Sequence, residues 1–211
     1  GSDIRMAYGP LFDEEQYPMK MGDPCHELSG TIVESRSDLF KTGQRVIVLP
    51  DQKGTGGLVE YISGHENKMI TVPDEGDLGE WTMCQPAGTV LYSCQQIGTI
   101  IGKNVLILGQ GGIGLSFTDI CSRAGARQII TTDLLNYRLQ FSKKLGATHT
   151  INPSEENLDN AVKEITGGEG AEITIEAAGY QETLNDSIRL VSKFGRIIIF
   201  GLQESVTNNI S

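Results

Sequence analysis

From residue 103 onward, short apolar runs alternate with stretches whose hydrophobic residues recur at helical spacing. The apolar runs predict strands at 104–108, 128–132, 148–151, 172–176 and 196–200. The stretches between them predict helices at 113–124, 134–145, 155–166 and 180–191. Strands that alternate with helices in this way form a parallel sheet with helices on both faces. We therefore expect a doubly wound parallel α/β sheet that binds its ligand at the carboxyl ends of the strands.

The chain up to about residue 80 has a different pattern, with short β-type runs separated by glycine and proline. The runs predict strands at 30–34, 44–49, 58–62 and 68–73. Several short strands at this spacing indicate a small barrel or sandwich. Residues 77–98 then carry a helical pattern, which we expect to be interrupted at Pro86 and to connect the two parts. The expected domains are 1–85 and 86–211.

A glycine cluster stands between the predicted strand at 104–108 and the helix that follows it. Gly109, Gly111 and Gly114 form a G-x-G-x-x-G pattern in this strand–turn–helix context. There, Gly109 makes the turn, Gly111 lets backbone approach a pyrophosphate, and Gly114 lets the helix pack on the strand. The free N–H groups at the helix start, including those of Gly112 and Ile113, would hold the phosphates.

Asp133 ends the second predicted strand of this part, 24 positions after Gly109. A carboxylate at about this position binds the 2′-hydroxyl of an adenosine ribose. The same charge would repel a 2′-phosphate, so the sequence favours NAD(H) over NADP(H). The alternative is that Asp133 is only an acidic cap on the next helix.

Two further strand ends carry small residues. Ala177, Ala178 and Gly179 follow the predicted strand at 172–176, and they would let a cofactor ring lie against backbone. Ordinary strand-to-helix turn chemistry is the alternative. Phe200 and Gly201 end the last predicted strand, at the same edge of the sheet.

Composition narrows the classes of partner. The 211 residues carry 17 basic and 27 acidic side chains, a formal charge of −10, which argues against nucleic acid and anionic membranes. No apolar run approaches the roughly 20 residues of a membrane helix. The cysteines Cys25, Cys84, Cys94 and Cys121 are scattered, without a C-x-x-C pattern, and fit a reducing cytoplasmic setting. A small-molecule substrate suits this balance.

Several motifs, in order, resemble the medium-chain, zinc-type alcohol/polyol dehydrogenase family. The matching segments are Gly1-Ser2-Asp3, Cys25-His26-Glu27, 41–46, 57–61, 109–114, and Arg138-Leu139 with 145–147. The resemblance implies a β-rich, GroES-like catalytic domain, partial here, followed by a Rossmann domain. It also implies hydride transfer between NAD(H) and an alcohol or polyol. In this family zinc binds the alcohol oxygen and stabilises the alkoxide, the better hydride donor.

The resemblance carries specific roles onto matching positions. His26 would be a zinc ligand, Glu27 its partner or an alternate ligand, and Asp3 would orient His26 through the other ring nitrogen. Ser2 would pass the substrate proton outward, and Arg138 would contact the adenosine ribose or the phosphates. Taken alone, His26 would be interpreted as a surface imidazole near a turn. The alternative for Gly1-Ser2 is a cloning remnant, in which case Ser2 would have no such role.

The sequence also departs from the family pattern. The position of the first zinc ligand, a cysteine, would precede Gly1, and the third ligand position holds Gln85 before Pro86. The neighbouring Cys84 could serve as a ligand, or it could be a small buried hydrophobe. Residues 51–57 contain no cysteine, so we expect no structural zinc. We therefore expect zinc assistance in the full-length protein. We expect this chain to be a fragment of it, and the sequence leaves open whether the fragment is active.

Two other functions stay open on the sequence alone. One is a zinc-independent quinone or enoyl reductase of the same superfamily, favoured by Gln85 and disfavoured by the pair His26-Glu27 and by Asp133. The other is a non-catalytic NAD-binding module. Family members commonly form dimers or tetramers through the Rossmann sheet edge, so a homo-oligomer is one option for this protein.

Overall fold

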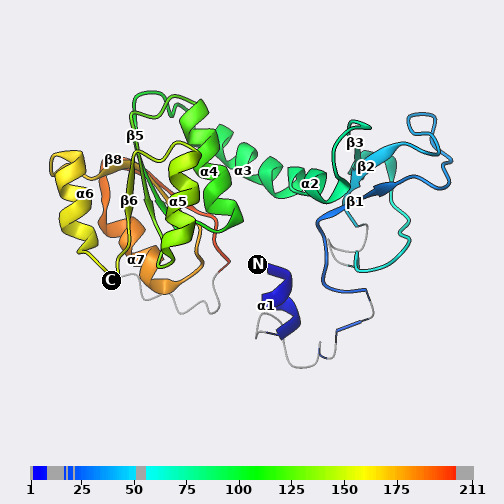
Figure 1. Ribbon diagram of the computed structural model, residues 1–211, viewed down its shortest axis with the longest axis horizontal. Coiled ribbons are helices and arrows are strands. Elements are labelled where there is room, and N and C mark those ends of the chain that lie inside the picture. The colour runs from blue at the N-terminus through cyan, green and yellow to red at the C-terminus, as the bar shows by residue number, and fades with distance from the viewer. Residues whose placement is uncertain (1, 9–16, 18, 21, 51–55, 203–211) are drawn as a thin grey trace. The chain divides into compact units, whose positions relative to one another are not determined.

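The computed structural model describes residues 2–8, 17, 19–20, 22–50 and 56–202 (Figure 1). The chain divides into two compact units, Gly1–Gly88 and Thr89–Ser211, and each is described by itself. Among the described residues, none of the helices combines the length and the apolar character needed to cross a bilayer.

The first unit is organised around a small antiparallel sheet. Its strands are β1 (Leu28–Thr31), β2 (Arg45–Val48) and β3 (Met69–Thr71), in the order β1-β2-β3. The central strand β2 buries three consecutive residues, Val46, Ile47 and Val48. Its helices are α1 (Ser2–Tyr8), the one-turn η2 (Glu66–Lys68) and α2 (Leu78–Thr82). Within the described residues the unit thus forms one three-stranded antiparallel sheet, in keeping with the β-rich first part that the sequence predicts.

The strand expected at 58–62 is wrong. Its backbone N–H groups join no ladder, because Leu58 N donates to the Gly22 carbonyl (2.8 Å) and Val59 N donates to the Gly57 carbonyl (2.9 Å). The apolar side chains of the segment are also largely exposed, with Leu58 at 68% and Tyr61 at 74%. The apolar composition suggested a strand, but one bond to the distant Gly22 and one local bond to Gly57 hold this backbone instead of a strand partner.

The helical connector breaks at a different residue from the one expected. It consists of α2 and α3 (Cys84–Ile97), and Met83 stands between them. Pro86 does not interrupt the pattern, because it lies in the first turn of α3. Backbone N–H groups in a first helical turn have no intrahelical acceptor, so the missing N–H of proline costs nothing there.

The second unit is a parallel five-stranded sheet in the order β6-β5-β4-β7-β8, as the alternating pattern predicted. The strands are β4 (Asn104–Leu108), β5 (Gln128–Thr132), β6 (His149–Ile151), β7 (Ala171–Glu176) and β8 (Val191–Ile199). The helices are α4 (Gly112–Arg123), α5 (Asn136–Lys144), α6 (Leu158–Thr166) and α7 (Gln181–Arg189). Strand β8 begins earlier than expected, because Val191 already pairs with Ala171 across a register shift.

Two hydrophobic clusters cover the two faces of this sheet. All five residues of the central strand β4 are buried, and they alternate between the faces. Val105 and Ile107 join the cluster that contains Phe117 of α4. Leu106 and Leu108 join the second cluster, which contains Val162 of α6. Helices on both faces bury the central strand β4 completely, while the edge strand β8 stays partly exposed. The strand ends are where a ligand can approach backbone.

Candidate functional site

The turn between β4 and α4 is built on close packing that only glycine permits. Gly109 has φ +94°, in the left-handed region, and a Cβ there would lie 2.8 Å from Ala178 Cβ. A Cβ on Gly114 would overlap the Gly109 carbonyl oxygen. The start of α4 therefore lies directly against the end of β4.

Gly111 differs from its neighbours because the space beside it is open. A Cβ on Gly111 would have no atom within 4 Å. Gly111 is also the N-cap of α4, and no side chain caps this helix end. The first helical hydrogen bond of α4 runs from Leu115 N to the Gly111 carbonyl (2.9 Å). The N–H groups of residues 112–114 come before it in the chain and therefore have no acceptor within the helix. An open space at an uncapped helix start fits a phosphate group.

The side chain of Gln110 stabilises the glycine turn, a role that the sequence analysis did not identify. Its side chain is fully buried. Its Nε2 donates to the Gly109 carbonyl (3.0 Å), and its Oε1 accepts a hydrogen bond from Thr118 Oγ1 (2.9 Å). The one available signal was a polar side chain between two glycines, since such a side chain must find partners when it is buried.

Asp133 lies at the end of β5 and is joined to the glycine turn. Its Oδ2 accepts a hydrogen bond from Gln110 N (2.8 Å), and its Oδ1 accepts one from Leu135 N (2.9 Å). The side chain is only 8% exposed, and Arg138 Nη1 lies 3.4 Å from Oδ2. The bond to Leu135, the N-cap of α5, is the capping contact considered as the alternative. Each carboxylate oxygen keeps acceptor capacity beyond these bonds, so capping and ribose binding are compatible.

Arg138 is held as a charged group beside this carboxylate. Its Nε donates to Tyr137 Oη (3.2 Å). This hydrogen bond, followed by the charge of Asp133, raises the pKa of Arg138. The structure thus brings together the glycine turn, Asp133 and Arg138, three features that the sequence analysis expected in one site.

The ends of β7 and β8 meet the same edge of the sheet. The Ala177 N–H donates to the Leu108 carbonyl, and the N–H groups of Phe200 and Gly201 donate to the Glu176 carbonyl. A Cβ on Gly201 would overlap Gly179 N, so the turns at 177–179 and 200–201 lie against each other. The carboxyl ends of β4, β7 and β8 therefore lie against one another and present a surface with small residues at 109, 177–179 and 201. That surface, together with the open space at Gly111, fits an extended dinucleotide.

In the first unit, His26 and Asp3 come together across 23 positions of sequence. His26 Nδ1 lies 3.0 Å from Asp3 Oδ1, and about a quarter of each side chain is exposed. This is the contact expected from the resemblance. Ser2 is the first residue of α1, and its side chain is outside the described residues.

Zinc does not fit the described side chains of this region. Cys84 is exposed at the start of α3 and Glu27 is half-buried. Throughout the described part of the chain, no three His, Cys, Asp or Glu side chains are grouped so that they could hold a metal ion. A zinc site needs three or four protein ligands, so His26 with Asp3 supplies only part of one.

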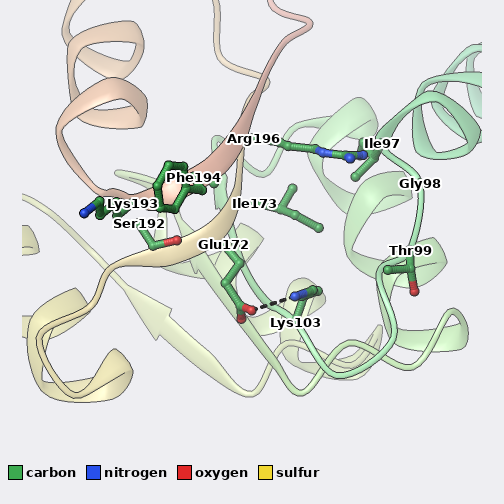
Figure 2. A pocket seen from close by; sticks show the side chains of 11 residues that line it. Ile97, Gly98, Thr99, Lys103, Glu172, Ile173, Ser192, Lys193, Phe194 and Arg196 are labelled. Atoms are coloured by element: carbon green, nitrogen blue, oxygen red, sulfur yellow. Dashed lines mark hydrogen bonds and ion pairs between the residues drawn. The ribbon is translucent and has the colours of Figure 1, made fainter.

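A pocket of about 410 Å³ lies at the opposite edge of the second sheet, near the amino ends of β4, β7 and β8 (Figure 2). Lys103 and Glu172 form an ion pair across it, with 2.9 Å between Nζ and Oε1. Glu172 Oε2 also accepts a hydrogen bond from Asn104 N (2.9 Å). None of the residues expected to bind a cofactor lines this pocket. The Glu172 carboxylate has a structural role, since it joins β7 to the start of β4.

The Glu172 contacts predict an acid-dependent stability term. The hydrogen bond from Asn104 N, followed by that from Lys103, holds the pKa of Glu172 below its usual range. A carboxylate with a lowered folded pKa stabilises the fold above its unfolded pKa of about 4.3, and this stabilisation is lost as the pH falls further. We expect Glu172→Gln to lose less stability than wild type between about pH 5 and about pH 3, by under about 1 kcal/mol, because the pair is partly solvated.

Urea unfolding at each pH measures this term. Glu156→Gln, at an exposed glutamate, is the matched control and should follow wild type. Identical acid profiles for wild type and Glu172→Gln would show that the bonds of Glu172 contribute nothing.

The chain is similar in sequence to known dehydrogenases. Residues 112–211 match the family described as zinc-binding dehydrogenase. A zinc-type alcohol dehydrogenase-like protein of Haemophilus influenzae is 30% identical, over 98% of this chain and 67% of its own length. Sorbitol dehydrogenase of Bacillus subtilis is 29% identical, over 84% of this chain and 58% of its own length.

A solved structure extends the similarity to the fold. The zinc-binding dehydrogenase of Sinorhizobium meliloti 1021, bound to NADP, has a TM-score of 0.78 and 25% identity over 87% of this chain and 62% of its own. The chain thus spans about two thirds of the length of such relatives. Its motifs, its parallel sheet and its relatives agree, and the chain belongs to the medium-chain, zinc-type alcohol/polyol dehydrogenase family.

Proposed function

We propose that the second unit binds NAD(H) and that the whole protein transfers a hydride between this dinucleotide and an alcohol or polyol. The observation that carries the proposal is the bond between Asp133 Oδ2 and Gln110 N, which places a nearly buried carboxylate directly beside the glycine turn. The bound dinucleotide would supply the hydride acceptor or donor. The chain would bind and orient it.

Each turn at the carboxyl ends of the parallel strands would contact one part of the dinucleotide. The N–H groups of residues 112–114 would bind the diphosphate beside the open space at Gly111. Asp133 would accept hydrogen bonds from the adenosine ribose, and Arg138 would lie at the same ribose or at the phosphates. The turns at 177–179 and 200–201 would contact the other half of the dinucleotide through backbone, since Ala177, Ala178, Gly179 and Gly201 have a small side chain or none.

The charge of Asp133 supports NAD(H) as the cofactor. A 2′-phosphate would stand against this carboxylate and would lose the hydrogen bonds that a 2′-hydroxyl can donate to it. The Sinorhizobium relative is a case bound to NADP, so cofactor preference varies among proteins of this fold. In this chain Arg138 is already close to Asp133, which leaves its charge partly neutralised and less able to bind a 2′-phosphate.

An alcohol or polyol substrate is supported by the curated relatives. They are named zinc-type alcohol dehydrogenase-like protein and sorbitol dehydrogenase. The contact between His26 and Asp3 supports a metal-binding role for His26 in the whole protein, because a carboxylate commonly orients a ligating imidazole. The described residues alone do not complete that site.

The proposal is tested by turnover and binding together. We expect the full-length protein to reduce NAD⁺ with at least one member of a panel of secondary alcohols and polyols. His26→Ala should lose at least about tenfold in turnover. It should bind NADH as wild type does, because the residues proposed to bind the dinucleotide lie in the other unit. A protein that binds NADH but oxidises no member of the panel would contradict the dehydrogenase activity.

Cytoplasmic localisation is part of the same proposal. All four cysteines are free thiols, with Cys94 and Cys121 buried. Free thiols are typical of a reducing compartment.

A further inference from the structure

Glu176, the last residue of β7, joins three strand ends at the edge proposed to bind the dinucleotide. Its backbone carbonyl accepts hydrogen bonds from Phe200 N (2.9 Å) and Gly201 N (3.0 Å). On its other side it is in register with Leu108, the last residue of β4. The residue thus stands between the glycine turn and the end of β8.

The Glu176 side chain organises the turn that follows it. It is fully buried. Its Oε1 accepts hydrogen bonds from Ala178 N (2.9 Å), Gly179 N (2.8 Å) and Thr183 Oγ1 (2.7 Å). One oxygen therefore fixes two consecutive peptide groups and the first turn of α7. Without it, these two N–H groups would need other acceptors or water.

The second oxygen of the same carboxylate has no partner. Oε2 is buried and makes no hydrogen bond among the described residues. It lies against Gly201, where a Cβ would overlap it. An unpaired buried polar atom costs stability, and such atoms in folded proteins call for an explanation. The cost indicates that this side chain is placed for the three bonds at Oε1.

The turn held by Glu176 has no room for displacement. Ala178 Cβ lies where a side chain on Gly109 would be, and Gly179 N lies where a side chain on Gly201 would be. The 177–179 turn is therefore packed between the glycine turn and the end of β8. Its backbone is the surface against which the nicotinamide half of the dinucleotide would lie.

From these contacts we propose that Glu176 is a positioning residue for the nicotinamide half of the bound dinucleotide, acting through the 177–179 turn. The inference rests on the proposed function. It adds a residue that the proposed ribose and phosphate contacts do not include. Glu176 would not touch the adenosine half, so its loss should weaken only ligands that carry nicotinamide.

The test compares NADH with ADP, which has the adenosine and both phosphates but no nicotinamide. In the 211-residue chain we expect Glu176→Ala to weaken NADH binding about tenfold, the equivalent of one typical hydrogen bond, and to change ADP binding less than about twofold. The enhancement of NADH fluorescence on binding should also fall. Glu176→Gln should restore most of the NADH affinity, because the amide oxygen can accept the same N–H bonds.

Two further variants keep the test decisive. Glu172→Gln, on the same strand but at its other end, should bind both ligands as wild type does. If Glu176→Ala does not fold, Thr183→Val removes one of the three donors to Oε1 and should weaken NADH binding by about threefold, with ADP unchanged.

Equal loss of NADH and ADP affinity in Glu176→Ala or Thr183→Val would overturn the inference, as would no loss of either. A Glu176→Gln variant that binds NADH as weakly as Glu176→Ala does would also overturn the inference. These outcomes differ from a failure of the proposed function, in which the wild-type chain would bind neither NADH nor ADP.

Discussion

Gly114→Ala is expected to destabilise the second unit by at least about 3 kcal/mol, because the added Cβ would overlap the backbone oxygen of Gly109. Neither the new methyl group nor the Gly109 carbonyl can move away without displacing backbone. The oxygen belongs to a residue whose own φ of +94° is fixed in the left-handed region, and its Cα faces Ala178. The helix must therefore move away from β4. We expect the melting temperature to fall by roughly 10 °C.

Gly111→Ala is the matched control, since it adds the same methyl group three residues earlier. Its Cβ would meet no atom within 4 Å, and the residue has φ −71°, which alanine adopts freely. We expect unchanged stability within about 0.5 kcal/mol but an NADH affinity at least tenfold weaker, because the methyl group would occupy the space proposed for the diphosphate.

Calorimetric melting and NADH titration of both variants separate packing from binding. A Gly114→Ala protein as stable as wild type would contradict the close packing of α4 on β4. Wild-type NADH affinity in Gly111→Ala would contradict the placement of the diphosphate.

Asp133→Ala is expected to weaken NADH binding by about 10- to 150-fold, the range that follows from losing charge-assisted hydrogen bonds worth roughly 1.5–3 kcal/mol. The same change leaves Gln110 N and Leu135 N without their acceptor. We therefore also expect a loss of about 1–3 kcal/mol in the free energy of unfolding.

Two controls separate these effects. Asp133→Asn keeps an oxygen that can accept a backbone N–H, so it should recover much of the stability but little of the NADH affinity. Asp119→Ala removes a carboxylate that pairs with Arg123 on the exposed side of α4, and it should leave NADH binding unchanged. If Asp133→Ala loses stability but binds NADH as wild type does, Asp133 is only a cap and a tie for the glycine turn.

The second unit followed closely from sequence because its signals are local and mutually consistent. The strands at 104–108 and 128–132 each have one polar residue, Asn104 or Gln128, followed by four apolar or β-branched ones. Glycine follows the first and aspartate the second, and the structure has both strands with the expected bounds. A central strand that is buried on both faces is easy to recognise in a sequence, since each of its side chains must be apolar or hydrogen-bonded, as in β4. The same pattern offered a helix cap as the alternative for Asp133, but it did not predict the hydrogen bond from Gln110 N.

The first unit was harder because its segments are short and their partners are distant. The 58–62 segment has strand composition, but no neighbouring strand accepts its hydrogen bonds, and only tertiary context decides such cases. The meeting of His26 with Asp3 came from the family resemblance, since nothing local joins residues 23 positions apart.

Gln110 and Glu176 were missed for a different reason. Each is a polar residue whose role depends on backbone N–H or carbonyl groups brought close by the fold. Sequence shows that a polar side chain stands at a strand end, but not which peptide groups it will meet.

Direct comparison of NAD⁺ and NADP⁺ binding to the wild-type chain, by calorimetric titration under one set of conditions, tests the central claim most directly. We expect saturable NAD⁺ binding at least about tenfold tighter than NADP⁺ binding, and near-equal affinities in Asp133→Ala. Absence of NAD⁺ binding, or NADP⁺ binding as tight as NAD⁺ binding in the wild-type chain, would contradict a carboxylate that holds the adenosine ribose beside the glycine turn.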